Sequence, residues 1–188
     1  MASLLAGQPV ADVVLDDVRR RVAALAPAGV IPGLGTILVG DAAPSAAYVG
    51  KKHETCAAVG IRSHHRHLPG DAGHAALLDA VVAFDADPEV HAYLVQLPLP
   101  AGYDLDAVLS AIDPAKDADG LHPENLGKLV LGEKAPVPCA PAGIQAMLIH
   151  YGIPTAGTHV VVVGRGPTLG RPMALLMSAK GPGADAAV

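Results

Sequence analysis

The sequence predicts an α/β fold with a mostly parallel sheet, because two kinds of periodicity alternate along the chain. Short apolar runs at Leu34–Val39 and Val90–Val95 are typical of strands buried inside a parallel sheet. Around them, apolar residues recur every three or four positions, as they do in amphipathic helices. A chain in which strands and helices alternate in this way usually forms a parallel sheet with helices packed on it.

Each element of the N-terminal part has its own signal. Ala11–Leu25 carries valines and leucines at helical spacing with charges between them, which predicts a helix. Ser45 is suited to cap a second helix that runs to Val59, where Gly60 provides the stop. The weakly alternating stretch Ile61–Leu68 predicts a strand near an edge of the sheet. Two further helices are expected at Ala75–Phe84 and Leu105–Ile112.

A change of composition after Asp113 indicates a second structural part. Residues 113–141 are rich in Pro, Gly, Asp and Lys and predict an ordered connection with helical turns around Glu124–Val130. Next are expected a helix, a strand and a helix, at Ala142–His150, His159–Val163 and Thr168–Ala179. We place a domain boundary near residues 138–142, which divides the chain into residues 1–140 and 141–188. The second part ends as a new strand begins, so we expect the natural chain to be longer.

Composition narrows the class of protein. Of 188 residues 51% are hydrophobic, so a substantial core is expected. The net charge is −5 and no basic cluster exceeds Lys51-Lys52, which argues against nucleic acid and membrane surfaces as partners. The N-terminus lacks the pattern of a secretory signal, and no stretch has the length of a membrane span. Cys56 and Cys139 stand in no metal or redox spacing, so we expect a cytoplasmic protein.

A glycine-containing turn in the second part is a candidate nucleotide site. The segment VVVVGRGPTLGRP places Gly164, Gly166 and Gly170 between a predicted strand and a predicted helix. Glycines there let backbone amides approach a pyrophosphate, which the helix N-terminus also favours. The spacing is one residue longer than the usual fingerprint, so a purely structural turn remains an alternative. Arg165 offers a cation for the 2′-phosphate of NADP, unless it is simply a solvated turn residue; Asp185 is discounted as a ribose ligand because it precedes the next predicted strand.

Candidate catalytic residues come from three distant stretches. Tyr48 and Lys52 are four apart and share a helix face, so an aromatic ring and a candidate acid or base lie together. Lys51, about a hundred degrees away, competes with Lys52 for that role. Gln96 follows a buried strand, where α/β folds place their ligands. Asp119 lies in a glycine-containing loop and is suited to grip an amidine edge such as that of a pterin. Each of these residues, taken alone, could instead be a side chain without a functional role that is solvated or hydrogen-bonded to nearby backbone.

Taken together, these stretches resemble the methylenetetrahydrofolate dehydrogenase/cyclohydrolase family in order and separation. The matching pieces are SAAYVGKKHETCAAVGI, VQLPLP, DPAKDADGLHPENLGKL, PCAPAGI and VVVVGRGPTLGRPMA. The resemblance implies an N-terminal three-layer α/β catalytic (folate-binding) domain followed by the start of a Rossmann-type NADP-binding domain. It also implies roles for four side chains. Tyr48 would stack on the folate, Lys52 would be the essential lysine, Gln96 would work beside it, and Asp119 would hold the pterin.

The resemblance further implies a two-step reaction. NADP would take a hydride from 5,10-methylenetetrahydrofolate, and water would then open the methenyl product to 10-formyltetrahydrofolate. Gly164, Arg165, Gly166 and Gly170 would bind the cofactor, and no metal would be needed. A homodimer and a place in one-carbon metabolism and purine biosynthesis are implied as well. If Val188 were the natural C-terminus, we expect dehydrogenase activity to be lost.

The chain departs from the family pattern at two places within these segments. Glu54 stands where a second lysine is common, and Gly166-Pro167 follows Arg165 where the family usually has a serine. Two other hypotheses remain: a noncatalytic folate- or nucleotide-binding module, and another NADP oxidoreductase such as a shikimate-type dehydrogenase. The histidines around His64–His67 are interpreted as part of a solvated edge strand, and His53 as a surface residue, rather than as metal ligands.

Overall fold

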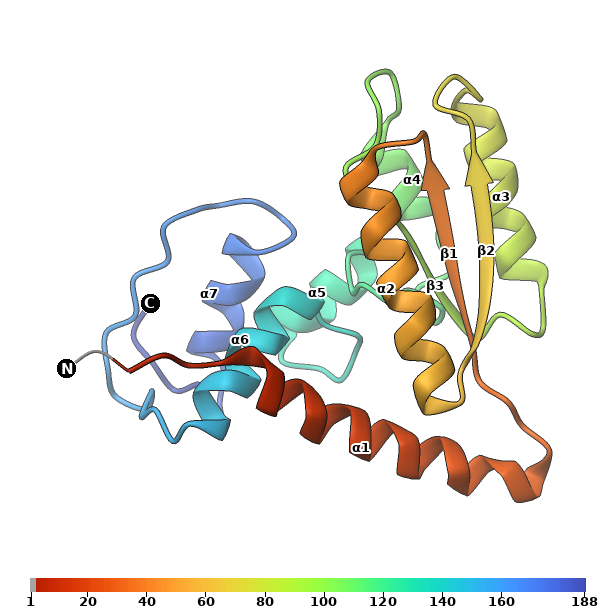
Figure 1. Cartoon of the computed structure of the whole chain (residues 1–188). Coiled ribbons are helices and arrows are strands. Elements are labelled where there is room, and N and C mark those ends of the chain that lie inside the picture. Colours follow the sequence, from red (N-terminus) through yellow and green to blue (C-terminus); the bar gives the residue numbers. More distant parts are fainter. Residues whose placement is uncertain (1–2) are drawn as a thin grey trace. The chain divides into compact units, whose positions relative to one another are not determined.

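The computed structural model describes residues 3–188, which form two compact units. One unit comprises residues 15–118, and the other comprises residues 119–188 with the N-terminal segment up to residue 14. Figure 1 shows the order of the elements along the chain. The first helix, α1 (Gly7–Leu25), is followed by a 3-10 turn at Ala26–Ala28. It starts four residues before the predicted Ala11, and residues 15–25 of it belong to the first unit.

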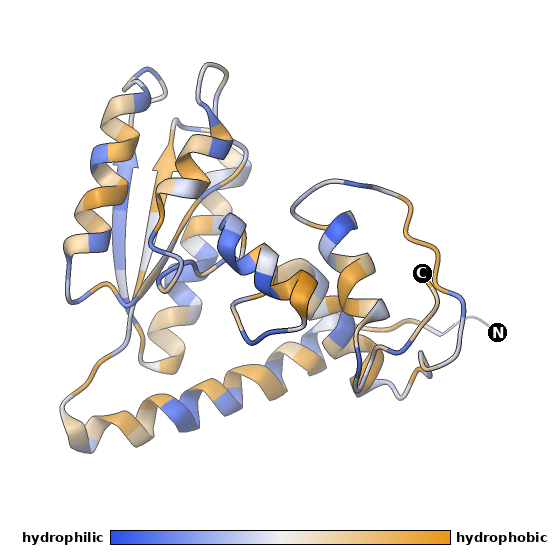
Figure 2. Cartoon of the chain, turned by 180° about the vertical axis from the view of Figure 1, so that it is seen from behind, coloured by the Kyte–Doolittle hydropathy of each residue, from blue (hydrophilic) through white to orange (hydrophobic). Residues whose placement is uncertain are grey.

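The first unit contains a three-stranded parallel sheet, which confirms the predicted α/β class. Its strands are β1 (Gly33–Val39), β2 (Arg62–Leu68) and β3 (Ala92–Val95), in the order β2-β1-β3. Both neighbours of β1 run parallel to it. β2 lies at an edge, as predicted, and is the most hydrophilic strand, whereas β1 is apolar (Figure 2).

Helices cover both faces of this sheet (Figure 1). α2 (Ala43–Val59) packs on one face, and α3 (His74–Ala86) and α4 (Leu105–Ala111) pack on the other. The alternation of side chains along β1 explains the division, since successive residues point to opposite faces. One face forms the main core, in which fully buried side chains include Ile37, Leu77, Val81, Tyr93 and Val108.

Helix α2 ends as expected and begins earlier than expected. Gly60 forms the C-cap in the left-handed conformation, with φ of 83°. The predicted N-cap, Ser45, is wrong, because the helix starts at Ala43 and Ser45 lies buried in its first turn. Pro44 accounts for the earlier start, since a proline in the first turn lacks only an N–H that would have no helical partner there.

The second unit is mainly helical. Its helices are α5 (Pro123–Leu131), α6 (Cys139–His150) and α7 (Gly170–Ser178), each close to its predicted position. The predicted strand His159–Val163 is not formed: among residues 3–188 the segment makes only an isolated bridge, from His159 to Ala187. Because a strand needs a hydrogen-bonded neighbour along its length, the apolar sequence alone does not create one here.

No helix within the described part of the chain is both long and apolar enough to cross a membrane.

Candidate active site

Helix α2 brings Lys52 against the end of strand β3. Lys52 lies between Val49 and Cys56 in the helical repeat, and both of these residues are buried against the sheet. This position makes Lys52 half-buried, and its Nζ donates a hydrogen bond of 2.8 Å to Oε1 of Gln96. The structure thus joins two predicted site residues that are 44 positions apart in the sequence.

Gln96 is held from both its backbone and its side chain. Its backbone N–H donates to the carbonyl of Ile37 at 2.8 Å, which fixes the residue at the end of the sheet. Its side-chain Nε2 donates to the carbonyl of Leu97 at 2.7 Å. With the amide nitrogen engaged in this way, the amide oxygen is the atom presented to Lys52.

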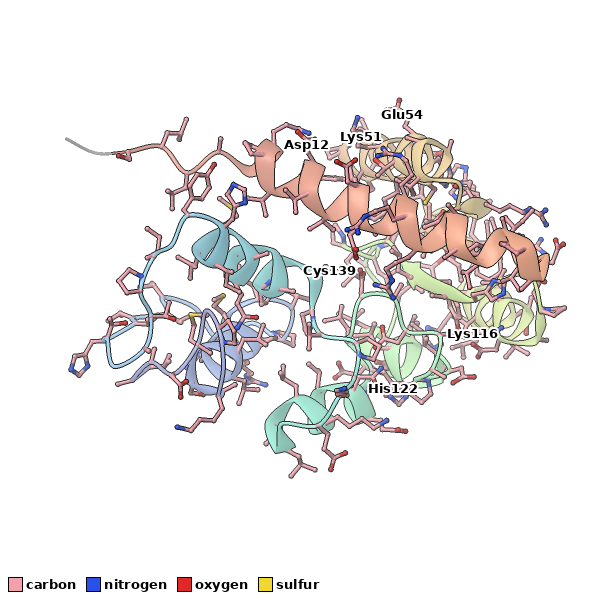
Figure 3. The ribbon with its side chains drawn as sticks, turned by 90° about the horizontal axis from the view of Figure 1, so that it is seen from below. Asp12, Lys51, Glu54, Lys116, His122 and Cys139 are labelled. Atoms are coloured by element: carbon pink, nitrogen blue, oxygen red, sulfur yellow. The ribbon has the colours of Figure 1, made fainter. Side chains whose placement is uncertain are left out.

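Lys51, the alternative candidate, is directed elsewhere. Its ammonium pairs with the carboxylate of Glu54 at 3.3 Å, and both side chains are exposed on the outer side of α2 (Figure 3). An exposed pair of this kind has little influence on stability. The geometry therefore favours Lys52 as the acid–base candidate.

Tyr48 lies one helical turn before Lys52 and is 66% exposed. A large aromatic side chain with this exposure offers an open ring face to a flat ligand. Its spacing from Lys52 places the ring and the ammonium on the same side of α2.

The segment that leads to Asp119 is anchored alongside β3. The N–H of Tyr93 donates to the Lys116 carbonyl at 2.8 Å, and the N–H of Ala118 donates to the Tyr93 carbonyl at 3.0 Å. Lys116, labelled in Figure 3, also donates from Nζ to three backbone carbonyls at the end of α3, those of Phe84, Asp85 and Asp87. This anchoring fixes the path of the chain up to residue 118.

Asp119 begins the C-terminal part of the second unit and precedes Gly120. Gly120 has φ of 66°, and a Cβ added there would lie 2.5 Å from the backbone of Val137. Only glycine fits both the conformation and the close approach. The backbone next to the candidate pterin ligand is therefore tightly specified.

The glycine turn has the close backbone approach that its sequence predicts. A Cβ added to Gly170, the first residue of α7, would lie 2.5 Å from the carbonyl oxygen of Gly164. Arg165 and Gly166 are exposed, and added atoms at Gly166 would meet nothing within 4 Å. A cavity of about 610 Å³ lies beside this turn and is lined by apolar residues of α6, α7 and residues 160–164. The turn thus has the open glycine backbone at a helix start that a phosphate-bearing ligand requires.

One polar cluster escaped the sequence analysis. Thr36, in the middle of β1, contacts the imidazoles of His53 on α2 and His65 on β2. The sequence does contain an indication of this cluster, because Thr36 is the one hydroxyl residue in the apolar run GLGTILV. His53, expected to be an unremarkable surface residue, is in fact half-buried. The residues that the structure describes contain no group of three or more His, Cys, Asp or Glu side chains arranged to hold a metal ion.

Cys56 packs on the sheet side of α2, and burial raises the pKa of its thiol despite an opposing hydrogen bond involving Ser63. The thiol therefore stays protonated near neutral pH and belongs to the packing of the helix.

Comparison with known proteins is consistent along the whole chain. The family model for the tetrahydrofolate dehydrogenase/cyclohydrolase catalytic domain matches residues 5–119, and the model for the NAD(P)-binding domain of the same family matches residues 138–188. The bifunctional protein FolD of Syntrophotalea carbinolica is 58% identical over 187 residues. That alignment covers 100% of this chain and 64% of the relative, so the chain spans just under two thirds of the relative's length.

Solved structures agree with the sequence matches. A 5,10-methylenetetrahydrofolate dehydrogenase from the silkworm Bombyx mori superposes with a TM-score of 0.95 at 32% identity, over 100% of this chain and 67% of the other. The methylenetetrahydrofolate dehydrogenase-cyclohydrolase of Trypanosoma brucei, solved with NADP and an inhibitor, gives a TM-score of 0.92 at 35% identity, over 100% and 63%. With a catalytic-domain match over most of its length and a lysine and glutamine joined at the end of its sheet, the chain belongs to the tetrahydrofolate dehydrogenase/cyclohydrolase family.

Proposed function

We propose that the protein interconverts one-carbon units on tetrahydrofolate. It would oxidise 5,10-methylenetetrahydrofolate with NADP and hydrolyse the methenyl product to 10-formyltetrahydrofolate. The observation that carries this proposal is the 2.8 Å hydrogen bond from Lys52 to Gln96, made within a chain of this family. An amine held by an amide at the end of a sheet is suited to move protons for a bound substrate.

The hydrolytic step follows from that pair. The oxygen of water bonds to the methenyl carbon, and Lys52 takes up a proton from it. The bond from this carbon to one ring nitrogen then breaks, a formyl group forms on the other nitrogen, and the departing nitrogen receives a proton. Because the methenyl compound carries a positive charge, one proton is released overall. Gln96 keeps the ammonium or amine of Lys52 in place during these transfers.

Two further residues would bind the substrate. Tyr48, with its exposed ring, would stack on the folate, and Asp119 would accept hydrogen bonds from the pterin edge. Positioning of the substrate carbon accounts for much of the rate in such reactions, because correct orientation replaces an unfavourable encounter.

The residues of the glycine turn fit NADP. The close approach of Gly170 to Gly164 leaves no room for a side chain there, and Gly166 is exposed with nothing within 4 Å of an added Cβ. Arg165 would meet the 2′-phosphate. When bound, NADP would supply the acceptor for the hydride.

The experiment that tests this function is the substitution Lys52→Gln, with Lys51→Gln as its matched control. We expect Lys52→Gln to lower the rate of methenyltetrahydrofolate hydrolysis by at least about 100-fold, which is the scale of general acid–base catalysis. Folate binding should remain largely intact, because Tyr48 and Asp119 are unchanged. Lys51→Gln should behave like the wild type, because the Lys51 ammonium is exposed and pairs with the Glu54 carboxylate rather than with Gln96. Normal turnover by the Lys52 variant would contradict the proposal.

Three broader proposals accompany this one. The chain would divide into a folate-binding domain at residues 1–140 and the beginning of an NADP-binding domain at residues 141–188, a boundary that limited proteolysis would test.

The protein would act as a homodimer, which light scattering would test. It would work in the cytoplasm, where Cys56 and Cys139 would stay reduced.

A further inference from the structure

A hydrogen-bonded cluster fastens α2 to the sheet one residue after Lys52. The hydroxyl of Thr36 lies 3.1 Å from Nε2 of His53 and 2.8 Å from Nδ1 of His65. The two imidazole rings meet edge to face, with centroids 5.1 Å apart. The cluster therefore joins three elements, β1, α2 and β2, through a single oxygen atom.

Packing alone does not explain why position 36 carries a hydroxyl group. Thr36 is 1% exposed, in a strand otherwise made of glycine and aliphatic residues. Valine would fill nearly the same volume and suits a strand equally well. A hydroxyl has one hydrogen to donate and two lone pairs to accept with, so it can bridge two imidazole nitrogens at once. Its removal would leave both nitrogens without this partner.

Two successive residues of α2 are thus held toward opposite flanks of the sheet. Lys52 reaches the end of β3, and His53 reaches β1 and β2. In the strand order β2-β1-β3, the Lys52 contact lies at the end of β3 and the His53 cluster lies at β1 and β2. Neighbouring residues of a helix point about 100° apart, so the two contacts together oppose rotation of α2 about its axis. Loss of the His53 contact would free the helix to turn and carry Lys52 away from Gln96.

The groups around the cluster disfavour a positive charge on His65. Burial, and next the neighbouring charge of His53, lower the pKa of His65, with a smaller lowering from His67 and an opposing effect of a hydrogen bond with the Thr36 backbone. His67 contacts the Gly40 carbonyl at 3.0 Å and the Asp41 carboxylate at 3.2 Å, at the start of α2.

Two charged groups of the surrounding elements have partners of their own. Arg19 of α1 donates to the Ala58 carbonyl, and Lys51 pairs with Glu54.

We propose that Thr36, acting through His53 and His65, is a positioning residue that sets the placement of Lys52 for methenyltetrahydrofolate hydrolysis. The proposal rests on the function proposed above for Lys52. Thr36 itself touches neither the substrate nor Lys52 in this account; it acts by holding the helix turn that carries the lysine.

The kinetic test compares Thr36→Val with Thr36→Ser. Valine removes the hydroxyl and keeps the shape, and we expect kcat for hydrolysis to fall about tenfold, because small displacements of a catalytic group have large effects on rate. KM should change less than about twofold, since the predicted folate contacts remain. Serine restores the hydroxyl and should return kcat to within about twofold of wild type. Thr55→Val, which removes a threonine hydroxyl bonded to the Lys51 carbonyl on the same helix, should have no effect.

Two kinetic results would overturn the proposal. One is a wild-type kcat in Thr36→Val, and the other is a loss in Thr36→Ser equal to that in Thr36→Val. Should Thr36→Val fail to fold, His53→Gln provides the second test, since it removes the helix-side imidazole from a half-buried position. Its expected result is the same tenfold fall in kcat, and an unchanged kcat would count equally against the proposal.

A second readout needs no substrate. The side-chain amide of Gln96 gives a distinct signal in nuclear magnetic resonance spectra, and Lys52→Met defines its position when the lysine contact is lost. We expect Thr36→Val to shift this signal toward the Lys52→Met position, while Thr36→Ser and Thr55→Val leave it unchanged. An unmoved signal in Thr36→Val would refute the positioning role. If the wild type does not hydrolyse the methenyl compound but the signal moves, then the proposed function fails and the positioning role stands.

Discussion

Two apolar runs of this protein, at residues 33–39 and 159–163, adopt different structures. The run GLGTILV forms β1, where Ile37 is fully buried between two neighbouring strands and helices on both faces. The run HVVVV at residues 159–163 forms no strand, and Val161 and Val163 are 85% and 97% exposed. Both runs consist mainly of apolar residues. The difference shows that apolar residues favour burial. Whether they form a strand depends on neighbouring strands and helices that can bury them.

Amide hydrogen exchange should show the largest difference between the two runs. Backbone amides of β1 should exchange only through opening of the whole unit, whereas the amides of Val161 and Val163 should exchange almost freely. We expect protection factors to differ by at least about 1,000-fold, given the usual stability of folded domains. Equal protection in the two segments would show that residues 159–163 are paired in solution.

A glycine pair sharpens the comparison at the level of packing. A Cβ added to Gly35 would lie 2.7 Å from Cβ of Tyr93 and 2.8 Å from the ring of Phe84, whereas one added to Gly166 would meet nothing. We expect Gly35→Ala to lower the free energy of unfolding by about 3 kcal/mol, through overpacking of the core. Gly166→Ala should change it by less than about 0.5 kcal/mol. Urea denaturation of both variants is the measurement, and similar losses would contradict the contrast.

A matched valine pair gives a smaller effect. Val39 is the last residue of β1 and lies in the core, and Val163 is the last residue of the apolar run in the second unit. We expect Val39→Ala to lower the free energy of unfolding by about 2 kcal/mol, from lost burial and the remaining cavity. Val163→Ala should be almost neutral, because the side chain is already in water. A substantial loss on Val163→Ala would mean that the second unit buries this residue.

The smallest effect is electrostatic and belongs to the sheet unit alone. Burial lowers the pKa of His65 in the folded protein below that of the unfolded chain. Its contribution to stability is therefore fully present above the unfolded pKa and is lost as the pH falls through the folded pKa. We expect His65→Gln to reduce the loss of stability seen between about pH 7 and pH 5. Unfolding midpoints of both proteins across this range test the prediction, and parallel curves would contradict it.

The sequence was most informative where a local pattern and its surroundings agree. The helix spacing around Tyr48 and Lys52, the stop at Gly60 and the buried runs of β1 and β3 all predicted the observed elements. These signals are local: glycine adopts a positive φ at low cost, and a short apolar run suits a buried strand. The candidate lysine and glutamine were found in the same way, through a helix position and a strand end.

Other features depended on partners that no local pattern names. Ser45 had the composition of a cap, but Pro44 allowed the helix to begin two residues earlier. The resemblance alone favoured Lys52 over Lys51 and placed Gln96 beside it, and the structure shows the direction of each side chain. Thr36 was passed over because its partners lie 17 and 29 residues away.

Local patterns were enough to predict the α/β class, the parallel sheet, most helix positions and the family resemblance, because periodicity and motif spacing are properties of neighbouring residues. The three-dimensional packing established which apolar run forms a strand, that Lys52 contacts Gln96, and that Thr36 joins His53 to His65. Strand pairing and side-chain hydrogen bonds depend on groups distant in sequence, and folding alone brings those groups within reach of one another.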